Sequence, residues 1–317
     1  PLCVAAKNLS PYGRGAAGYF FMNKIVFKQQ LSEEVFLMQV EAPLIAGERQ
    51  PGQFVILQLN DDFGERIPLT IADADAERGT ITLVFQTVGK TTHELADLNV
   101  GDKIRNLVGP LGHPTHIENF GTVVCVGGGI GVAPLHPIVQ GMKKAGNRLI
   151  VIMGARTKEL LILEDRMRAL ADELIICTDD GSAGRKCLVT EPLKEICSRD
   201  PKPNLAVAIG PPIMMKFCAE TTRPFAVPTV VSLNTIMIDG TGMCGGCRVS
   251  VGGETKFTCV DGPEFDGHKV DFDNLMKRLR AYKAHEDEAH EKCHLEREAA
   301  KVSSQRPTSN FERSTQK

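Results

Sequence analysis

Three cysteines with a fixed spacing constrain the fold more than any other feature of this chain. Cys244 and Cys247 stand in the segment Asp239-Gly-Thr-Gly-Met-Cys-Gly-Gly-Cys, and Cys259 follows after eleven further residues. The plant-type spacing C-x4-C-x2-C…C holds a [2Fe–2S] cluster through four thiolates. Because Asp239 stands at the first position of that pattern, the segment predicts a [2Fe–2S] site with the ligands Asp239, Cys244, Cys247 and Cys259.

The glycines of this segment favour a loop that wraps closely around inorganic sulfide. Residues 240, 242, 245 and 246 are glycine, and glycine can adopt positive φ and turn its N–H group inward. Two alternatives stay open. A CxxC pair with a third thiol and an acidic ligand also suits tetrahedral zinc, and the segment could be a metal-free loop in which Asp239 only forms a turn.

Size and charge narrow the class of protein. The chain has 317 residues, enough for two or three domains, and a formal net charge of −2, which gives no electrostatic basis for binding nucleic acid. It has no apolar run of about 18 residues, so we expect no membrane span. Cys125, Cys177 and Cys218 lie in apolar runs without paired spacing, which favours the reducing cytoplasm over secretion.

The two ends of the chain are predicted to lie outside the packed domains. Residues 1–21 lack periodicity, and Met22 is a candidate start, so they are interpreted as a non-native or disordered leader. Residues 268–317 turn polar. Within them Asn274–Lys301 is expected to be helical, and 302–317 is expected to be disordered because it lacks apolar anchors.

The middle of the chain divides by its hydrophobic pattern. Residues 22–117 contain short strand candidates with turns between them, which predicts an antiparallel β-barrel; these candidates are Lys24–Leu31, Val35–Val40, Gln53–Leu59, Thr80–Gln86 and Asp102–Leu107. Residues 118–230 alternate buried strands with helices, which predicts a doubly wound parallel sheet. The expected strands are Thr122–Val126, Arg148–Met153, Leu174–Thr178 and Leu205–Ile209; the expected helices are Ala133–Ala145, Leu160–Leu170 and Val189–Cys197. Residues 231–267 are the predicted cluster module.

Two motifs in the barrel region are candidates for binding a flavin. Arg66-Ile-Pro-Leu-Thr70 places a guanidinium, which suits a pyrophosphate, four residues before a hydroxyl that could reach flavin N5. Val88-Gly-Lys-Thr-Thr92 opens an expected helix over Thr91–Asp97, whose first N–H groups could hold a flavin phosphate. The alternatives are a solvated surface arginine and a simple helix cap by Thr91 or Thr92.

Three further segments follow expected strands, at the sheet edge where nucleotides bind. Gly127-Gly-Gly-Ile-Gly131 joins a strand to a helix and would let a pyrophosphate approach the backbone, although its order is not GxGxxG and a tight packing turn is an equal alternative. The others are Gly154-Ala-Arg-Thr157 and Asp179-Asp-Gly-Ser182. Arg156 could favour a 2′-phosphate, so the choice between NAD and NADP stays open.

In chain order, RIPLT at 66–70, GKTT at 89–92, GGGIG at 127–131, GPP at 210–212 and D-x4-C-x2-C-x11-C at 239–259 resemble the ferredoxin–NADP reductase superfamily. Within it the chain is most similar to the small subunit of NADH-dependent reduced ferredoxin:NADP oxidoreductase, also called sulfide dehydrogenase, and to the electron-transfer subunit of dihydroorotate dehydrogenase. Asp239 and the helical tail favour the first, because the second has four cysteines.

The resemblance implies an FAD on the barrel, NAD(H) on the α/β domain with NADP(H) not excluded, and a [2Fe–2S] cluster. The residues that would contact FAD are Arg66, Pro68, Leu69, Thr70, Gly89, Lys90, Thr91 and Thr92. Those expected at the nicotinamide dinucleotide are Gly127, Gly128, Gly129, Ile130, Gly131, Gly154, Ala155, Arg156, Asp179, Asp180, Gly210 and Pro211. No acid–base catalytic residue is expected.

The expected function is hydride transfer between NADH and FAD, with single electrons passing through the cluster. The implied assembly is a heterodimer with a larger subunit that carries its own FAD and [4Fe–4S] clusters, couples NADH to ferredoxin and NADP by electron bifurcation, and docks on the tail helix. Two alternatives remain: the electron-transfer subunit of dihydroorotate dehydrogenase, and a redox-sensing or adaptor subunit that does not turn over nicotinamide.

Overall fold

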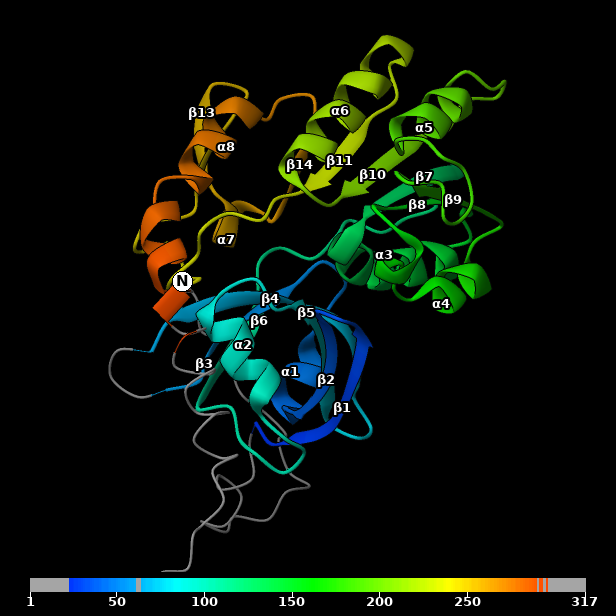
Figure 1. Cartoon of the computed structure of the whole chain (residues 1–317). Helices are drawn as coiled ribbons and strands as arrows, with labels where there is room; N and C mark the ends of the chain where they lie inside the picture. The colour runs from blue at the N-terminus through cyan, green and yellow to red at the C-terminus, as the bar shows by residue number, and fades with distance from the viewer. Residues whose placement is uncertain (1–22, 61–63, 290, 293–294, 296–317) are drawn as a thin grey trace, which may run out of the picture.

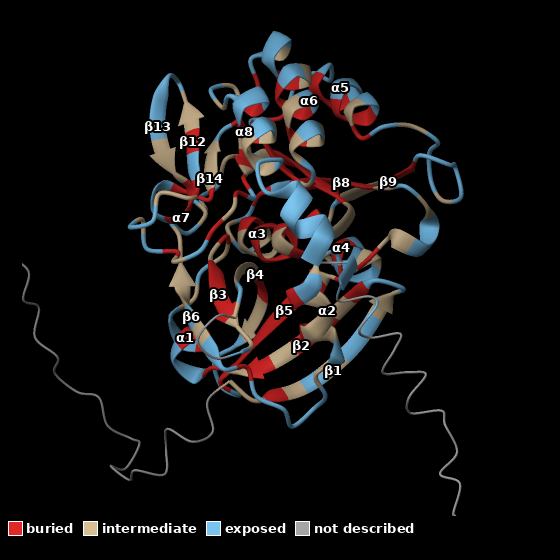
Figure 2. Cartoon of the chain, turned by 60° about the vertical axis from the view of Figure 1, so that its left-hand side comes forward, coloured by how far each residue is buried: buried red, intermediate tan, exposed pale blue. Residues whose placement is uncertain are grey.

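The computed structural model describes residues 23–60, 64–289, 291–292 and 295. Two six-stranded sheets and one two-stranded sheet form the framework, and the two large sheets lie in separate parts of the molecule (Figure 1). Many residues of the central strands are buried, whereas much of the helix surface is exposed (Figure 2). Among the described residues, no helix is both long enough and apolar enough to cross a bilayer.

The first sheet is antiparallel and has the strand order β1-β2-β5-β4-β3-β6. Its outer segments approach each other, since Ile25 N donates to Asp102 O at 2.9 Å and Ile104 N donates to Asn23 O at 3.0 Å. The strands are β1 (Ile25–Ser32), β2 (Val35–Glu41), β3 (Phe54–Gln58), β4 (Arg66–Asp75), β5 (Thr80–Gln86) and β6 (Asn106–Leu111), with the short helices α1 (Pro43–Glu48) and α2 (Lys90–Asp97) between them.

Two strands of this sheet differ from their prediction. The sequence indicated an extended segment only over residues 66–70, whereas β4 continues to Asp75 and crosses the sheet. The strand expected over Asp102–Leu107 begins at Asn106, and Lys103 instead forms an isolated bridge with Lys24. Many residues of both strands are half-buried. The hydrophobic pattern of the sequence therefore did not mark where either strand begins or ends.

The second sheet has the order β14-β11-β10-β7-β8-β9, with five parallel strands and β14 antiparallel at one edge. Its strands are β7 (Thr122–Gly128), β8 (Arg148–Ala155), β9 (Glu173–Thr178), β10 (Leu205–Ile209), β11 (Thr229–Ser232) and β14 (Glu264–Asp266). The connecting helices are α3 (Val132–Lys144), α4 (Glu164–Leu170), α5 (Thr190–Cys197) and α6 (Pro212–Thr222), with 3₁₀ turns η2 (Gly129–Gly131), η3 (Lys158–Leu160) and η4 (Arg223–Phe225).

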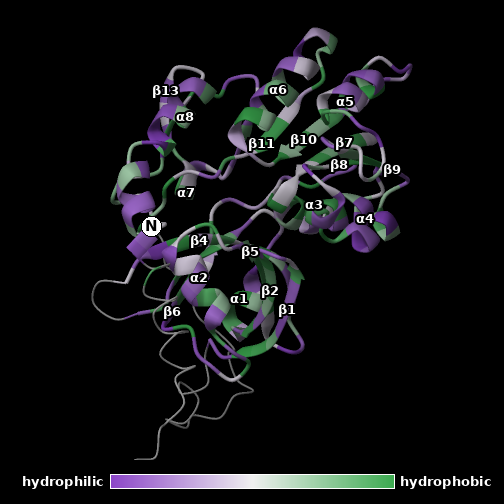
Figure 3. Ribbon diagram, in the orientation of Figure 1, coloured by the Kyte–Doolittle hydropathy of each residue, from purple (hydrophilic) through white to green (hydrophobic). Residues whose placement is uncertain are grey.

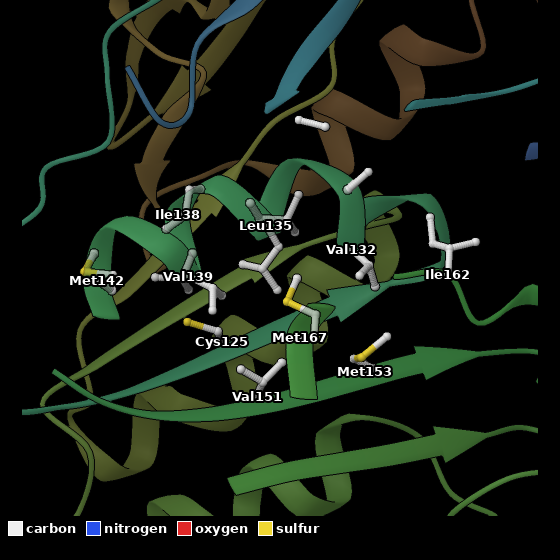
Figure 4. Close-up of a cluster of buried hydrophobic side chains, with 14 of the residues drawn as sticks. Cys125, Val132, Leu135, Ile138, Val139, Met142, Val151, Met153, Ile162 and Met167 are labelled. Carbon is white, nitrogen blue, oxygen red and sulfur yellow. The ribbon is translucent and has the colours of Figure 1, made fainter. Parts of the chain in front are cut away.

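Helices cover both faces of this sheet, because alternate strand residues point to opposite sides. Cys125 and Val151 pack with α3 and Met167 of α4, whereas Val124 and Ile150 pack with α5 and α6. Figure 4 shows the first of these two layers, with the apolar side of α3 lying over the strands. In Figure 3 the central strands β7, β8 and β10 are mostly green, whereas the helix α4 carries much more purple.

Several elements of this region were not predicted. No helix was predicted after Pro211, but α6 begins at Pro212, in keeping with the preference for proline at the start of a helix. The helix expected from Leu160 begins at Glu164, because residues 158–160 form a 3₁₀ turn. β11 and β14 extend the parallel sheet from segments at the two ends of the predicted cluster module.

The cluster segment packs on the barrel. It contains the hairpin β12 (Arg248–Val251) and β13 (Glu254–Phe257) and the short helix α7 (Thr258–Asp261). Cys247 and Cys259 share a small core with Phe54 and Ile56 of β3. The barrel also packs on α3, since Val35 and Ala72 belong to the same core as the residues of Figure 4.

The tail is helical in two pieces within its described part. α8 (Phe272–Leu279) buries Phe272 and Leu275 against the α/β domain, and helix resumes over residues 283–289 after turn residues at 280–282. The single helix expected over Asn274–Lys301 is therefore interrupted. Residues 296–317 and the leader lie outside the described residues, so the predictions made for them stay predictions.

Candidate cofactor sites

Arg66 has the environment of a residue that binds an anion. It begins β4, opposite Gln58 of β3, and its Nε is buried without a hydrogen-bond partner in the described part of the chain. A buried donor left unpaired costs about 1–3 kcal/mol, and a charge-assisted bond to phosphate would remove that cost. The geometry fits a flavin pyrophosphate better than a solvated surface arginine.

The second flavin motif lies next to the first. Thr91 Oγ1 donates to the carboxylate of Glu65, the residue before Arg66. Thr92 Oγ1 accepts from Val88 N at 3.1 Å and from Gly89 N at 3.0 Å, so Thr92, in the first turn of α2, bonds back to the N-cap residue Gly89. Lys90 forms an ion pair of 3.8 Å with Glu94. The predicted cap by Thr91 or Thr92 is therefore wrong in its residue, because Gly89 is the N-cap, while Thr91 ties the helix to the Arg66 strand.

The remaining predicted flavin residues of β4 are half-buried and available at the surface of the sheet. Pro68, Leu69 and Thr70 pair with Ile56, Val55 and Phe54 of β3. The structure thus places residues 66–70 on one strand, in contact through Glu65 with the start of α2. This arrangement could hold an elongated ligand along β4.

A cavity of about 760 Å³ lies at the carboxyl ends of the parallel strands. This is the edge where doubly wound sheets bind nucleotides, and the volume suits a ligand of dinucleotide size. The predicted residues that line it are Gly128, Gly129, Ile130, Gly154, Ala155, Arg156, Asp179, Gly210 and Pro211.

The glycines of the first loop serve two purposes. A Cβ on Gly131 would lie 2.4 Å from Ile209 O, and one on Gly128 would lie 2.3 Å from Met214 Sδ. Gly129 instead has φ +54 and nothing within 4 Å of its Cβ position. The packing turn and the binding loop are therefore both present, with close packing at Gly131 and open backbone at Gly129.

Three predicted dinucleotide residues do not line the cavity. Gly127 and Gly131 are buried in the turn itself. Asp180 is exposed and accepts from Ser182 N at 2.9 Å and from Ser182 Oγ at 2.6 Å, and these bonds lower the pKa of Asp180. Asp180 thus stabilises its own loop, whereas its neighbour Asp179 lines the cavity.

The cluster loop is organised around Asp239. Its carboxylate accepts from Thr241 N at 3.2 Å, Met243 N at 3.1 Å and Cys244 N at 3.0 Å. Burial raises the pKa of Asp239, but these hydrogen bonds outweigh it and the pKa is lowered. Gly240, Gly242 and Gly245 all have positive φ, as the glycine content predicted.

The four predicted ligands form two pairs. Asp239 Oδ1 lies 3.3 Å from Cys244 Sγ, and Cys247 Sγ lies 3.2 Å from Cys259 Sγ. Across the described residues, no three such side chains converge on one point to hold a single metal ion. A zinc ion needs four ligands around one centre, whereas two irons bridged by sulfide each take two protein ligands. The paired arrangement fits a [2Fe–2S] cluster better than zinc.

The Cys247 and Cys259 thiols must lose their protons before they can bind a metal. Burial, followed by the hydrogen bond to Cys247, raises the pKa of Cys259 to about 12. Metal ligation requires thiolates, and a bound metal deprotonates them outright. Binding of iron by this pair would therefore release both thiol protons.

Some residues at the cavity could not be found from sequence motifs. Val35 and Gln86 come from the barrel and Asn234 from the segment before the cluster. Cys177, Cys187, Met214 and Phe217 also line it. Only the spacing of Met214 from Gly210-Pro211, one helical turn, offered a signal, because the other contacts depend on how distant segments meet.

Comparison with known proteins identifies the family. Residues 234–271 match the iron–sulfur cluster binding domain of dihydroorotate dehydrogenase B. A dihydroorotate dehydrogenase B (NAD(+)) electron transfer subunit homolog from Thermotoga maritima is 50% identical over 271 residues, which cover 86% of this chain and 95% of that protein. The chain belongs to this family of electron-transfer subunits.

Two solved structures extend the comparison. A structure of an NADH-dependent reduced ferredoxin–NADP oxidoreductase, determined to understand flavin-based electron bifurcation, is 49% identical with a TM-score of 0.81, covering 86% of this chain and 97% of that one. A ferredoxin NADP⁺ reductase from Neisseria gonorrhoeae, at 17% identity and a TM-score of 0.52, covers 64% of this chain and 90% of its own and shares the fold alone.

These similarities confirm the expected class. The electron-transfer subunit has a ferredoxin-reductase-like fold with β-sheets, an α/β domain and an iron–sulfur binding domain. It is an oxidoreductase subunit, and its cofactors are FAD, NAD(H) and a [2Fe–2S] cluster.

Proposed function

We propose that this electron-transfer subunit exchanges hydride between NAD(H) and FAD and connects FAD to its [2Fe–2S] cluster within a bifurcating NADH/ferredoxin:NADP oxidoreductase heterodimer. The observation that carries the proposal is the position of the barrel between the other two sites. Gln86 of β5 lines the dinucleotide cavity, while Phe54 and Ile56 of β3 pack against Cys247 and Cys259. β4, which carries Arg66, lies between β5 and β3.

The barrel residues would hold the flavin on β4. Arg66 would pair with the pyrophosphate, the start of α2 with Gly89, Lys90, Thr91 and Thr92 would bind phosphate, and Thr70 would face the flavin ring. When bound, the flavin accepts a hydride from the nicotinamide and releases electrons singly. The protein's contribution is orientation, because the cavity lined by Gly129 and Gly210 opens beside Gln86 of the barrel.

The cluster loop would supply the ligands in the two pairs seen in the structure. Asp239 and Cys244 would bind one iron, and Cys247 and Cys259 the other. N–H groups that bond to a ligand stabilise negative charge and tune the cluster potential. Asp239 receives three such bonds, so the loop is built around this carboxylate as a ligand.

We infer that the partner is a larger subunit with its own FAD and [4Fe–4S] clusters, which gives access to ferredoxin and NADP, and that the assembly works in the cytoplasm. Support for this assembly is the 49% identity to a bifurcating oxidoreductase. Docking is assigned to the tail beyond Arg280. Truncation after residue 270 would also remove the buried Leu275 and the hydrogen bond from Arg278 to Gly246 O, which belong to the fold of the subunit itself. The docking test should therefore truncate after residue 282, which keeps both.

A second candidate is an electron-transfer subunit of dihydroorotate dehydrogenase, favoured by the matched iron–sulfur domain. Asp239 argues for the first candidate, because the dihydroorotate subunit has cysteine there. Reconstitution with each large subunit separates the two, since only the true partner should copurify and accept electrons from NADH.

An anaerobic visible spectrum, with iron, sulfide and flavin quantified, tests the proposal. We expect flavin bands above the broad absorption of two irons and two sulfides, and bleaching on addition of NADH. Zinc in place of iron would refute the cluster assignment. Flavin that NADH fails to bleach would leave only a sensing or adaptor role.

Arg66→Leu tests the flavin site. Loss of a charged hydrogen bond of about 2–3 kcal/mol should weaken FAD binding by roughly a hundredfold, while the melting temperature of the flavin-free protein should not fall, because a buried unpaired Nε is removed. Arg78→Leu, at an exposed turn, is the matched control. Equal flavin affinity in the two variants would place the pyrophosphate elsewhere.

A further inference from the structure

Cys177 and Cys187 form a thiol pair that the proposed function does not use. Their sulfurs lie 3.5 Å apart, and neither belongs to the cluster loop. Cys177 lies near the end of β9 and is buried, while Cys187 is half-buried. Burial, and then the neighbouring Cys187 thiol, raises the pKa of Cys177 to about 12.

The loop between the two cysteines brings them together. Thr178 N donates to Arg185 O at 2.9 Å, and Arg185 N donates to Ile176 O at 2.8 Å, so the chain returns to the strand it left. Inside the loop, Thr178 Oγ1 donates to Ala183 O at 2.7 Å and accepts from Ala183 N at 3.1 Å. The two sulfurs therefore meet through a backbone that is already fixed.

The pair stands on the wall of the dinucleotide cavity. Cys177, Cys187 and Asp179 all line it, as do Gly154 and Ala155 on the neighbouring strand. A disulfide has an S–S bond of about 2.05 Å, so a small side-chain movement closes the gap without unfolding the loop. A dinucleotide in this cavity would cover the thiols, and a disulfide would change the surface that the dinucleotide meets.

We propose that Cys177 and Cys187 are a redox-active dithiol, which forms a disulfide by exchange with a low-molecular-weight disulfide and is shielded by bound dinucleotide. The more accessible Cys187 loses its proton and attacks the external disulfide, which releases one thiol and leaves a mixed disulfide on Cys187. Cys177 then loses its proton and attacks the Cys187 sulfur, releasing the second thiol. Two protein thiols are oxidised and one external disulfide is reduced to two thiols.

The test treats the anaerobic holoprotein with oxidised glutathione and blocks free thiols with N-ethylmaleimide. Trypsin separates the two cysteines, because Cys177 lies in peptide 169–185 and Cys187 in peptide 187–194, each without a second cysteine. We expect the two peptides to appear linked, with the mass of their sum less two hydrogen atoms. Iron content is followed in the same samples, so that attack on the cluster cysteines is recognised.

Matched variants decide the outcome. Cys187→Ser should abolish the link, whereas Cys125→Ala, which removes a buried cysteine on the other side of the sheet, should leave it intact. Phenylarsine oxide, which bridges paired thiols, should bind the wild-type pair and spare Cys187→Ser, even if disulfide yield is low. Two results together would overturn the proposal. At saturating glutathione disulfide the two peptides would remain unlinked and carry N-ethylmaleimide, and phenylarsine oxide would not bind this pair.

Shielding by dinucleotide is a separate readout, and it rests on the proposed function. Saturating NAD⁺ should slow formation of the link at least about fivefold, the size expected when a ligand covers most open molecules. Formation of the link at an unchanged rate would remove the dinucleotide from this cavity and refute that part of the proposed function. The dithiol itself would then still be established by the linked peptides.

Discussion

Two pairs of cysteine sulfurs lie at nearly the same separation in this molecule, 3.2 Å for Cys247 and Cys259 and 3.5 Å for Cys177 and Cys187. The first pair is buried on both sides and stands beside a second pair of ligand atoms, from Asp239 and Cys244. The second pair has one half-buried member and faces a cavity. Sulfur separation alone therefore does not distinguish a metal site from an exchange site.

The surroundings make the difference. In the cluster loop, glycines with positive φ bring backbone N–H groups toward Asp239 and Cys244, which supplies further ligands and the hydrogen bonds that tune them. Around Cys177 and Cys187 the loop satisfies its own hydrogen bonds instead. A thiol pair without further ligands and with access to solvent is suited to exchange chemistry.

The largest difference should appear in iron and sulfide content when one sulfur is removed from each pair in separate variants. Cys259→Ala should lower bound iron and acid-labile sulfide below about a tenth of the wild-type level. Loss of a residue that only hydrogen-bonds to a metal ligand already lowers metal affinity about 10–100-fold, and loss of a ligand should cost at least as much. Cys187→Ala should keep both. Iron and sulfide assays of the two purified variants test this directly. Similar losses in both would break the distinction between the pairs.

The glycines of the two sites should respond differently to a methyl group. Gly131→Ala would place its Cβ 2.4 Å from the backbone oxygen of Ile209, and overpacking of this kind costs about 3 kcal/mol. Residue 245 has φ +66, and an alanine Cβ there would meet the end of the Arg248 side chain at 3.1 Å and Phe257 Cε1 at an ordinary contact distance of 3.7 Å. Gly245→Ala is therefore expected to cost about 1 kcal/mol, mainly from left-handed strain. We expect melting temperatures lower by roughly 8 °C and 3 °C. The reverse order would show that the strain of positive φ at residue 245 costs more than the close contact of residue 131 with Ile209 O.

The contrast between the two sites also explains how far the sequence could predict them. The iron–sulfur motif could be recognised because its spacing is local, and three of the four loop glycines, Gly240, Gly242 and Gly245, have the positive φ expected of such a loop. The binding edge of the parallel sheet was found because glycines follow its strands. The sequence could not show that Val35 and Gln86 of the barrel reach that cavity, or that Cys187 returns to Cys177, since both depend on tertiary pairing. The full length of β4 was missed because its second half contains Asp73 and Asp75 beside alanines, residue types that are depleted in strands.

The smallest effects should separate the two loop carboxylates. Asp239 accepts three backbone N–H bonds within the cluster loop, and Asp180 accepts its bonds from Ser182 within the cavity loop. Asp239→Cys should keep the iron, because a thiolate replaces the carboxylate as ligand. Its midpoint potential should fall, since a thiolate donates more charge and the N–H bonds that stabilise negative charge are weakened.

Asp180→Asn is the matched change on the other loop. An amide oxygen can still accept from Ser182, so NADH affinity should change less than about twofold, and the cluster potential should stay where it is. Redox titration and NADH binding, measured on both variants, give four numbers. An unchanged potential in Asp239→Cys would mean that Asp239 only shapes its loop, as Asp180 does, and the two carboxylates would then have the same role despite their different surroundings.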